Sequence, residues 1–160
     1  MGITIRPIEE KDNLSLAKMI RSVFEEHDAP RQGTVYSDPT TDNLYQLFQT
    51  VKSILWIAEI EGKSIGCCGV YPTKGLNENC AELVKFYLDK SARGKGVGKE
   101  LMQRCILSSK EFGYKHLYLE SLPQFSKAVS IYEKQGFIRI DKPLGKSGHT
   151  SCSIWMLKEL

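Results

Sequence analysis

The sequence feature that most constrains the fold is a glycine-rich turn between an apolar run and a helical pattern. Three of the five residues 94–98 are glycines, and Arg93, Lys95 and Lys99 surround them. The apolar run before the turn is Ala81–Leu88, and apolar residues at helical spacing follow it. A strand-to-helix turn of this kind leaves backbone N–H groups unpaired at the start of the helix. Those groups, the helix dipole and the cations together favour an anion, so the turn predicts a diphosphate site.

Length and composition exclude several classes of protein. The 160 residues suit one domain with a sizeable core, and a net charge of +3 is too small to indicate a nucleic-acid-binding protein. The five cysteines form no CxxC pair, so neither a disulfide framework nor a zinc site is predicted, and we expect no bound metal. No run approaches the roughly 18 apolar residues that a membrane span needs, and the N-terminus lacks a signal-peptide apolar stretch. We expect reduced thiols and a cytoplasmic location.

The rest of the chain alternates between strand and helix patterns. A first short strand ends at Pro7, and further strands are predicted at residues 54–60, 65–71, 80–88, 116–122, 137–140 and 151–157. Helices are predicted from Asp12 or Asn13 to about Glu26, and at 42–50, 97–112 and 126–135. The inner stripe of the first helix is expected to include Leu14 and Phe24. This order of elements predicts an α+β fold with one mixed sheet.

Two familiar phosphate-binding loops do not fit the turn. A Walker A loop requires Ser or Thr after Gly-Lys and a glycine at its start, but the chain has Glu100 and Arg93 at these positions. A dinucleotide-binding fingerprint requires Gly or Ala at its last position, which here is Lys99 or Leu101. The turn is therefore neither an NTPase loop nor a Rossmann loop, and a glycine-rich turn that binds nothing is the remaining structural alternative.

A third pattern does fit. Arg93, Gly96 and Gly98 form Arg-x-x-Gly-x-Gly, and residues 128–137 read Ala-x-x-x-Tyr-Glu-Lys-x-Gly-Phe. With the preceding strand, the following helix and the order of elements, this combination resembles the GNAT superfamily of acyl-CoA-dependent N-acyltransferases. The resemblance covers essentially the whole chain and implies a single GNAT domain over residues 1–160. It implies a mixed, mostly antiparallel sheet of about seven strands, four flanking helices and two splayed central strands.

The resemblance also implies where acetyl-CoA binds. The molecule would lie between the splayed strands 80–88 and 116–122, with its pantetheine arm on the backbone of the first strand and its pyrophosphate on the glycine turn. Phe125 stands where many GNAT proteins have an asparagine that contacts pantetheine, so it is expected either to pack against the cofactor or to wall the acceptor pocket. The cofactor-binding residues implied are Phe86, Tyr87, Leu88, Arg93, Gly94, Lys95, Gly96, Val97, Gly98, Lys99 and Phe125.

Transfer to an amine requires a group that removes a proton from the acceptor ammonium. Glu82 is one candidate, because it stands six residues before Leu88, where the histone-acetylating branch has its catalytic glutamate. Glu120, on the neighbouring strand, is the rival, at the position of the base in the ribosomal-protein branch. A β-bulge would reset which face each residue occupies. In a third interpretation neither carboxylate is catalytic and one binds the positive charge of the acceptor.

Three further side chains are candidates for the chemistry. By resemblance, Tyr132 would protonate the leaving thiolate, although it also fits a purely structural stripe with Val129 on its helix. His149 precedes the last strand and would act either as a base or acceptor ligand, or have no role. Cys152 offers a nucleophile in principle, but proteins of this superfamily normally transfer the acyl group directly in a ternary complex.

These residues predict an N-acetyltransferase that moves acetyl from acetyl-CoA to a primary amine of a small molecule or peptide. The alternative is a non-catalytic acyl-CoA sensor or interaction module. The acceptor pocket is expected to be walled by residues 27–41, 72–79 and 141–149. Acidic side chains there and on the splayed strand suggest an anionic mouth for a cation; they are Asp28, Asp38, Glu78 and Glu82. The resemblance is also compatible with a homodimer.

Overall fold

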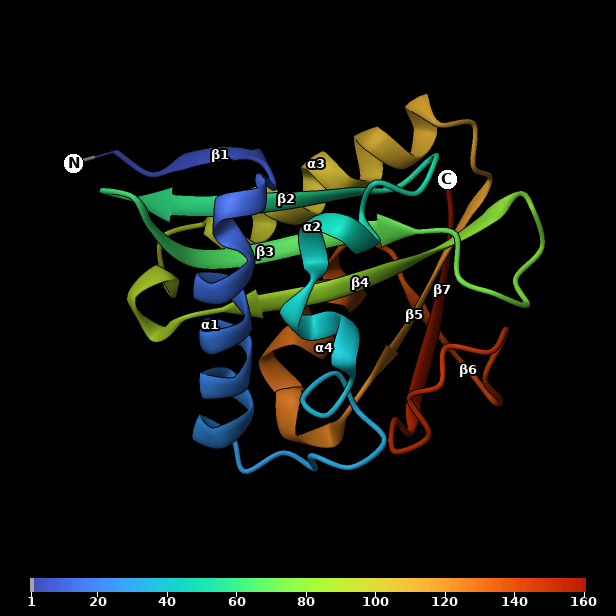
Figure 1. Ribbon diagram of the computed structural model, residues 1–160. Helices are drawn as coiled ribbons and strands as arrows, with labels where there is room; N and C mark the ends of the chain where they lie inside the picture. Colours follow the sequence, from blue (N-terminus) through green and yellow to red (C-terminus); the bar gives the residue numbers. More distant parts are fainter. Residues whose placement is uncertain (1) are drawn as a thin grey trace.

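A computed structural model describes residues 2–160 as a seven-stranded sheet with helices on both faces (Figure 1). The sheet has the order β1-β2-β3-β4-β5-β7-β6, and only β4 and β5 are paired in parallel. Its strands are β1 (Thr4–Pro7), β2 (Ile54–Ile60), β3 (Lys63–Tyr71), β4 (Cys80–Leu88), β5 (His116–Ser121), β6 (Ile138–Ile140) and β7 (Ile154–Glu159). The helices are α1 (Asn13–Glu26), α2 (Leu44–Leu47), α3 (Val97–Glu111) and α4 (Ser126–Lys134). The predicted α+β fold is confirmed.

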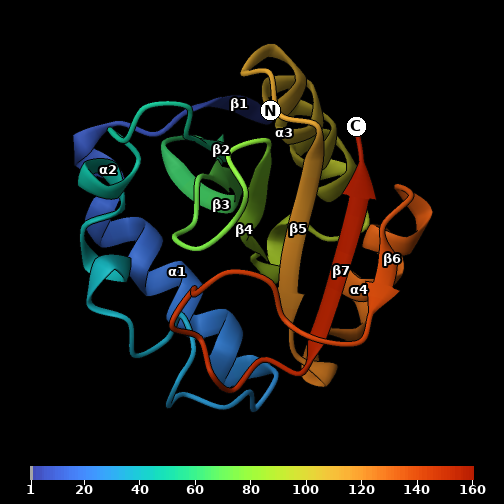
Figure 2. The same cartoon turned by 90° about the vertical axis from the view of Figure 1, so that its right-hand side faces the viewer.

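The helices form two layers. Helices α1 and α2 pack on one face of the sheet, around residues such as Phe24 and Leu44, whereas α3 and α4 pack on the other face, around Leu101 and Tyr132 (Figures 1 and 2). Leu14, which was expected to point inward, is 80% exposed, and the buried residue in that turn of α1 is Leu16. Across residues 2–160, none of the helices combines the length and the apolar character that crossing a membrane would demand.

Two predicted elements begin or end elsewhere. The expected helix at 42–50 is shortened to the single turn of α2, because Asn43 leaves the helical conformation after a short 3-10 segment at Pro39–Asp42. The last strand begins at Ile154 rather than at residue 151, and a turn occupies the residues just before it. Conversely, β3 begins two residues early, at Lys63, because Glu61 and Gly62 both adopt positive φ and form a two-residue hairpin turn.

The central strands diverge and create the site. Strand β4 pairs with β5 only at Cys80–His116, Ala81–Leu117 and Glu82–Tyr118. Beyond Glu82 the two strands separate, and Figure 1 shows α4 next to the opening. The edge of β4 that faces β5 therefore has no strand partner along its second half, which leaves a fork in the middle of the sheet.

A β-bulge in β4 sets the direction of its side chains. Gly69 of β3 is paired with Val84 and Cys67 with Tyr87, so two steps along β3 correspond to three steps along β4. The extra residue lies near Lys85, whose φ is +57°. Because the bulge resets the alternation, Tyr87 faces the α1 layer, as Val84 does before the bulge.

Candidate active site

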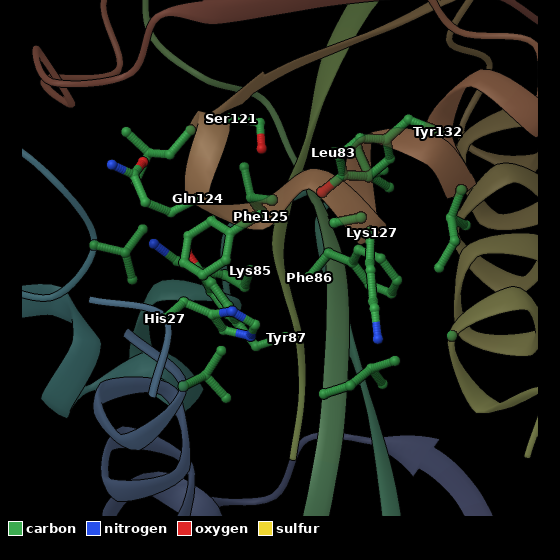
Figure 3. A pocket seen from close by; sticks show the side chains of 18 of the residues that line it. His27, Leu83, Lys85, Phe86, Tyr87, Ser121, Gln124, Phe125, Lys127 and Tyr132 are labelled. Carbon is green, nitrogen blue, oxygen red and sulfur yellow. The ribbon is translucent and has the colours of Figure 1, made fainter. Parts of the chain in front are cut away.

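The fork opens into a cleft of about 550 Å³ that separates the two helix layers. Its walls come from α1, β4, the glycine turn, β5, the start of α4 and the loop before β7. Figure 3 shows side chains from both layers around it, with His27, Lys85 and Phe125 on one side of β4 and Tyr132 and Lys127 on the other. The cleft therefore has two ends, one at the glycine turn and one enclosed by loops.

The glycine turn presents free backbone donors to this cleft. Gly94 and Gly96 both have φ near +75°, which lets the chain turn directly into α3. The first backbone hydrogen bond of that helix runs from Glu100 N to Gly96 O, at 3.1 Å. Within residues 2–160 the backbone N–H groups of residues 94–99 form no hydrogen bond to another backbone group. Six consecutive N–H groups at a helix start are suited to bind an anion.

An ion pair and the close packing of one glycine hold the turn in place. The guanidinium of Arg93 donates to Leu88 O at 2.9 Å and forms an ion pair with Glu26 of α1. Gly98 packs so tightly that a Cβ there would lie 3.0 Å from Leu88 and 3.1 Å from Phe86. Arg93 lines the cleft, but it uses its charge to brace the turn against α1.

Glu82 lies at the vertex of the fork. It is the last residue of β4 paired with β5, and its side chain is buried. Thr73 Oγ1 donates a 2.6 Å hydrogen bond to Oε1 of Glu82. Burial, together with the nearby charge of Glu120, raises the pKa of Glu82 to about 7, although Thr73 and Lys85 oppose this rise. A carboxylate with this pKa is suited to accept and release a proton near neutral pH.

Glu120 is engaged by two hydroxyl groups. Tyr118 Oη donates to one of its carboxylate oxygens at 2.7 Å, and Ser147 Oγ donates to the other at 2.6 Å. Tyr118 in turn accepts a hydrogen bond from the backbone N–H of Leu144. Glu120 lines the cleft, but these contacts make it the anchor of the loop between β6 and β7. Within residues 2–160, Glu82 accepts a hydrogen bond on one carboxylate oxygen only, whereas both oxygens of Glu120 accept one.

Tyr132 lies in the opposite wall of the cleft. Its ring packs against Phe86 and Phe137, with ring centroids 5.7 and 5.9 Å away, and it also lines the cleft (Figure 3). Burial, together with neighbouring cysteines, raises the pKa of its phenol well above the ordinary value, so the group is protonated at neutral pH. Tyr132 thus belongs to the core and is also positioned to donate a proton into the cleft.

Phe125 joins the two helix layers across the cleft. Its ring packs against Phe24 of α1 at 5.2 Å, against His27 at 5.5 Å and against Tyr87 of β4 at 6.0 Å. Of the two expected roles, these contacts favour a wall of the pocket. Phe125, His27 and Tyr87 all line the cleft, so the aromatic cluster forms part of its wall.

The enclosed end of the cleft is formed by loops that contact one another. His149 Nε2 lies 2.9 Å from Asp38 Oδ2, joining the β6–β7 loop to the α1–α2 loop. Burial alone would raise the pKa of Asp38, but the hydrogen bonds from His149 and Thr40 lower it to about 2. Burial raises the pKa of Cys152 to about 12, so its thiol is not a ready nucleophile.

The structure modifies the predicted acceptor pocket. Residues from the first and third predicted walls line the cleft, but none from 72–79 does; that segment instead contributes Thr73, which holds Glu82. The anionic mouth is wrong as stated, because neither Asp28 nor Glu78 lines the cleft. Sequence reasoning also missed Lys85, which is 6% exposed and lines the cleft. The available signal was a lysine inside the apolar run of β4.

Comparisons with known proteins agree with this geometry. A model of the Acetyltransferase (GNAT) family matches residues 20–137. The chain is 35% identical over 157 residues to an uncharacterized N-acetyltransferase, YjgM, of Escherichia coli K12. The aligned residues cover 98% of this chain and 94% of the relative.

Solved structures share the fold at lower identity. An acetyltransferase of the GNAT family from Staphylococcus aureus Mu50 superposes with a TM-score of 0.83 at 22% identity, over 99% of both chains. The PaiA N-acetyltransferase of Thermoplasma acidophilum, solved in complex with coenzyme A, superposes with a TM-score of 0.76 at 22% identity over the full length of both chains. The forked sheet and its cleft are those of an acyltransferase. The chain belongs to the GNAT acetyltransferase family.

Proposed function

We propose that the protein transfers an acetyl group from acetyl-CoA to a primary amine, directly and within a ternary complex. The observation that carries the proposal is the cleft itself, which joins the unpaired N–H groups of the glycine turn to Glu82 at the vertex of the fork. The neighbour solved with coenzyme A supports acyl-CoA as the donor.

The donor would bind along the side of β4 that β5 leaves free. The backbone N–H groups of residues 94–99 would hold the pyrophosphate, with the cations Lys95 and Lys99 nearby. The unpaired edge at Phe86, Tyr87 and Leu88 would bind the pantetheine arm as an added strand does. The thioester would then lie near the vertex, where a backbone N–H of β4 can stabilise the oxyanion.

The chemistry would depend on proton transfers at Glu82 and Tyr132. Glu82 takes a proton from the acceptor ammonium, and the resulting amine nitrogen forms a bond to the thioester carbonyl carbon, whose oxygen becomes an oxyanion. The tetrahedral intermediate then collapses: the C=O bond forms again, the C–S bond breaks, and the phenol of Tyr132 gives its proton to the leaving thiolate. The nitrogen loses its second proton, which returns to the phenolate of Tyr132 through solvent, and the proton on Glu82 is released to solvent. The pKa of about 7 at Glu82 supports the proton transfer from the acceptor. The place of Tyr132 in the wall of the cleft supports the proton transfer to the thiolate.

The test is release of free CoA thiol when the purified protein is mixed with acetyl-CoA and a broad panel of primary amines. We expect at least one amine to raise thiol release well above hydrolysis. Tyr132→Phe should lower kcat by about 10²-fold or more, which is the usual contribution of a positioned acid. Tyr114→Phe is the matched control, because Tyr114 donates to Lys52 O outside this cleft. Acetyl-CoA binding without turnover of any amine would instead support a sensor.

A further inference from the structure

A buried lysine lies in the cleft without a partner. Lys85 occupies the β-bulge of β4 and is 6% exposed. Within residues 2–160 its ammonium takes part in no hydrogen bond and in no ion pair shorter than 4.0 Å. Among these residues no side-chain nitrogen is both sealed from solvent and unpartnered, so the ammonium of Lys85 is not fully sealed, and Lys85 lines the cleft.

Lys85 lies toward the end of the cleft that is enclosed by loops, away from the glycine turn. It lies on the side of β4 that carries His27 and Phe125, away from Tyr132 and Lys127 (Figure 3). The titratable groups that act on it are the carboxylates of Asp38 and Glu82 and the thiol of Cys67. Asp38 already accepts hydrogen bonds from His149 and Thr40, and Glu82 accepts one from Thr73. Both neighbouring carboxylates therefore have other partners.

A cation in this position favours one class of acceptor. Burial disfavours the charged form of Lys85. An anionic group of a bound ligand would stabilise that charged form by forming an ion pair that the protein itself does not supply. A second ammonium at the same place would be repelled, and strongly so in a cleft of low dielectric constant. Glu82 lies three residues away on the same strand, roughly 10 Å or less along the backbone. A base and a cation at this separation match an amine and a carboxylate within one small molecule.

We propose that the acceptor is an amino acid or a similar small amino-carboxylate, whose amine faces Glu82 and whose carboxylate pairs with Lys85. This inference rests on the proposed acetyl transfer, and it replaces the cationic acceptor that an anionic mouth would select. The pairing holds the carboxylate end of the acceptor and leaves the acetyl transfer itself to Glu82 and Tyr132. Lys85 is accordingly a specificity residue.

The first test uses the unmodified chain. Thiol release from acetyl-CoA is measured with matched sets of acceptors: free amino acids, their C-terminal amides and the corresponding decarboxylated amines. We expect turnover of one or more free acids, with kcat/KM at least tenfold lower for the matching amide and amine. Equal turnover of acid and amide, or turnover of polyamines but of no amino acid, overturns this inference and leaves acetyl transfer intact. Absence of turnover with every amine overturns both.

The second test examines the lysine. Lys85→Met keeps an unbranched chain at the bulge but removes the charge, and Lys85→Arg keeps the charge. We expect Lys85→Met to raise KM for the acid at least tenfold and to leave the amide nearly unaffected, whereas Lys85→Arg retains a preference for the acid. A loss that is equal for acid and amide would contradict the proposed pairing. Melting temperatures and KM for acetyl-CoA, measured in parallel, show whether each variant is folded.

Discussion

Thr73 Oγ1 lies 2.6 Å from Oε1 of Glu82 and donates a hydrogen bond to it from the loop between β3 and β4. The carboxylate is buried at the point where β4 and β5 separate, and burial pushes its pKa upward. The hydroxyl opposes that rise by stabilising the charged form. These two effects, together with the charges of Glu120 and Lys85, bring the pKa to about 7, so the pKa of Glu82 depends in part on a residue of the β3–β4 loop.

Replacing Glu82 with glutamine should remove the proposed base. Glutamine keeps an oxygen for Thr73 but cannot take a proton, so we expect kcat/KM for the amine to fall by about 10²- to 10⁴-fold. The rise of activity through about pH 7 in the wild-type chain should also disappear. Thiol release measured from pH 5.5 to 9 with one amine tests both effects, because ionisation of the amine is common to both proteins.

Glu120→Gln is the informative comparison for this prediction. Glu120 already accepts hydrogen bonds from Tyr118 and Ser147, so its loss should mainly loosen the β6–β7 loop. We expect a higher KM for the amine and a pH profile that keeps its rise but shifts to lower pH, because loss of the Glu120 charge lowers the pKa of Glu82. A Glu120→Gln variant that lost the rise near pH 7, beside a Glu82→Gln variant that kept it, would reverse the assignment.

Replacing Thr73 with valine should shift the pH dependence without changing the carboxylate. Valine has the shape of threonine but no hydroxyl, so the charged form of Glu82 loses a hydrogen bond and its pKa rises. At pH 7 about half of the base is ionised in the wild type and less than a tenth in the variant, so we expect about sevenfold lower kcat/KM, since such a bond is worth roughly 1.5 kcal/mol. Activity should recover at higher pH. Thr73→Ser, which keeps the hydroxyl, should behave as the wild type; a uniform loss at every pH would exclude the proposed role.

Local patterns were enough to predict the strand-turn-helix at residues 80–112 and the order of elements. Strand β4 begins and ends where its apolar run does, and the positive φ of Gly96 marks the start of α3. Helix α1 was placed correctly, yet Leu14 proved exposed, because apolar spacing alone does not distinguish two neighbouring leucines that differ by about half a turn. Which face is buried depends on the packing of the whole layer.

The contacts that define the site depend on distant segments, and for that reason they were not predictable. Thr73 reaches Glu82 through the register of β3 on β4, which pairs Tyr71 with Glu82, and His149 meets Asp38 across 111 residues. Lys85 looked like an ordinary charged residue in the sequence. Its burial follows from the bulge. The position of a bulge cannot be predicted from the simple alternation of side chains along a strand.

Replacing Gly96 with alanine should weaken binding at the glycine turn. Its φ of +75° is left-handed, which costs an alanine about 1–2 kcal/mol, and no other atom lies within 4 Å of the added Cβ. We expect a matching loss in the free energy of unfolding and a higher KM for acetyl-CoA, because relaxation of the turn redirects its N–H groups. Gly62→Ala is the matched control, since Gly62 has φ +78° and equally open surroundings in the β2–β3 hairpin. Gly62→Ala should lose similar stability but keep KM unchanged. An equal KM for acetyl-CoA in both variants would contradict the proposed binding of the pyrophosphate at the glycine turn.

The raised pKa of Glu82 also predicts how stability depends on pH. The folded chain binds this proton more tightly than the unfolded chain, with a pKa of about 7 against an ordinary value of 4.5. Glu82 therefore reduces the free energy of unfolding as pH rises from about 4.5 to about 7, and the reduction persists at higher pH. Glu82→Gln removes this cost, so its stability relative to the wild type should increase by about 3 kcal/mol between pH 4.5 and pH 8. Denaturant unfolding of both proteins at several pH values measures the difference, in which the contributions of all other groups cancel. A difference that stays constant with pH would show that Glu82 ionises as an exposed carboxylate does, and would remove the physical basis for its role as a base near neutral pH.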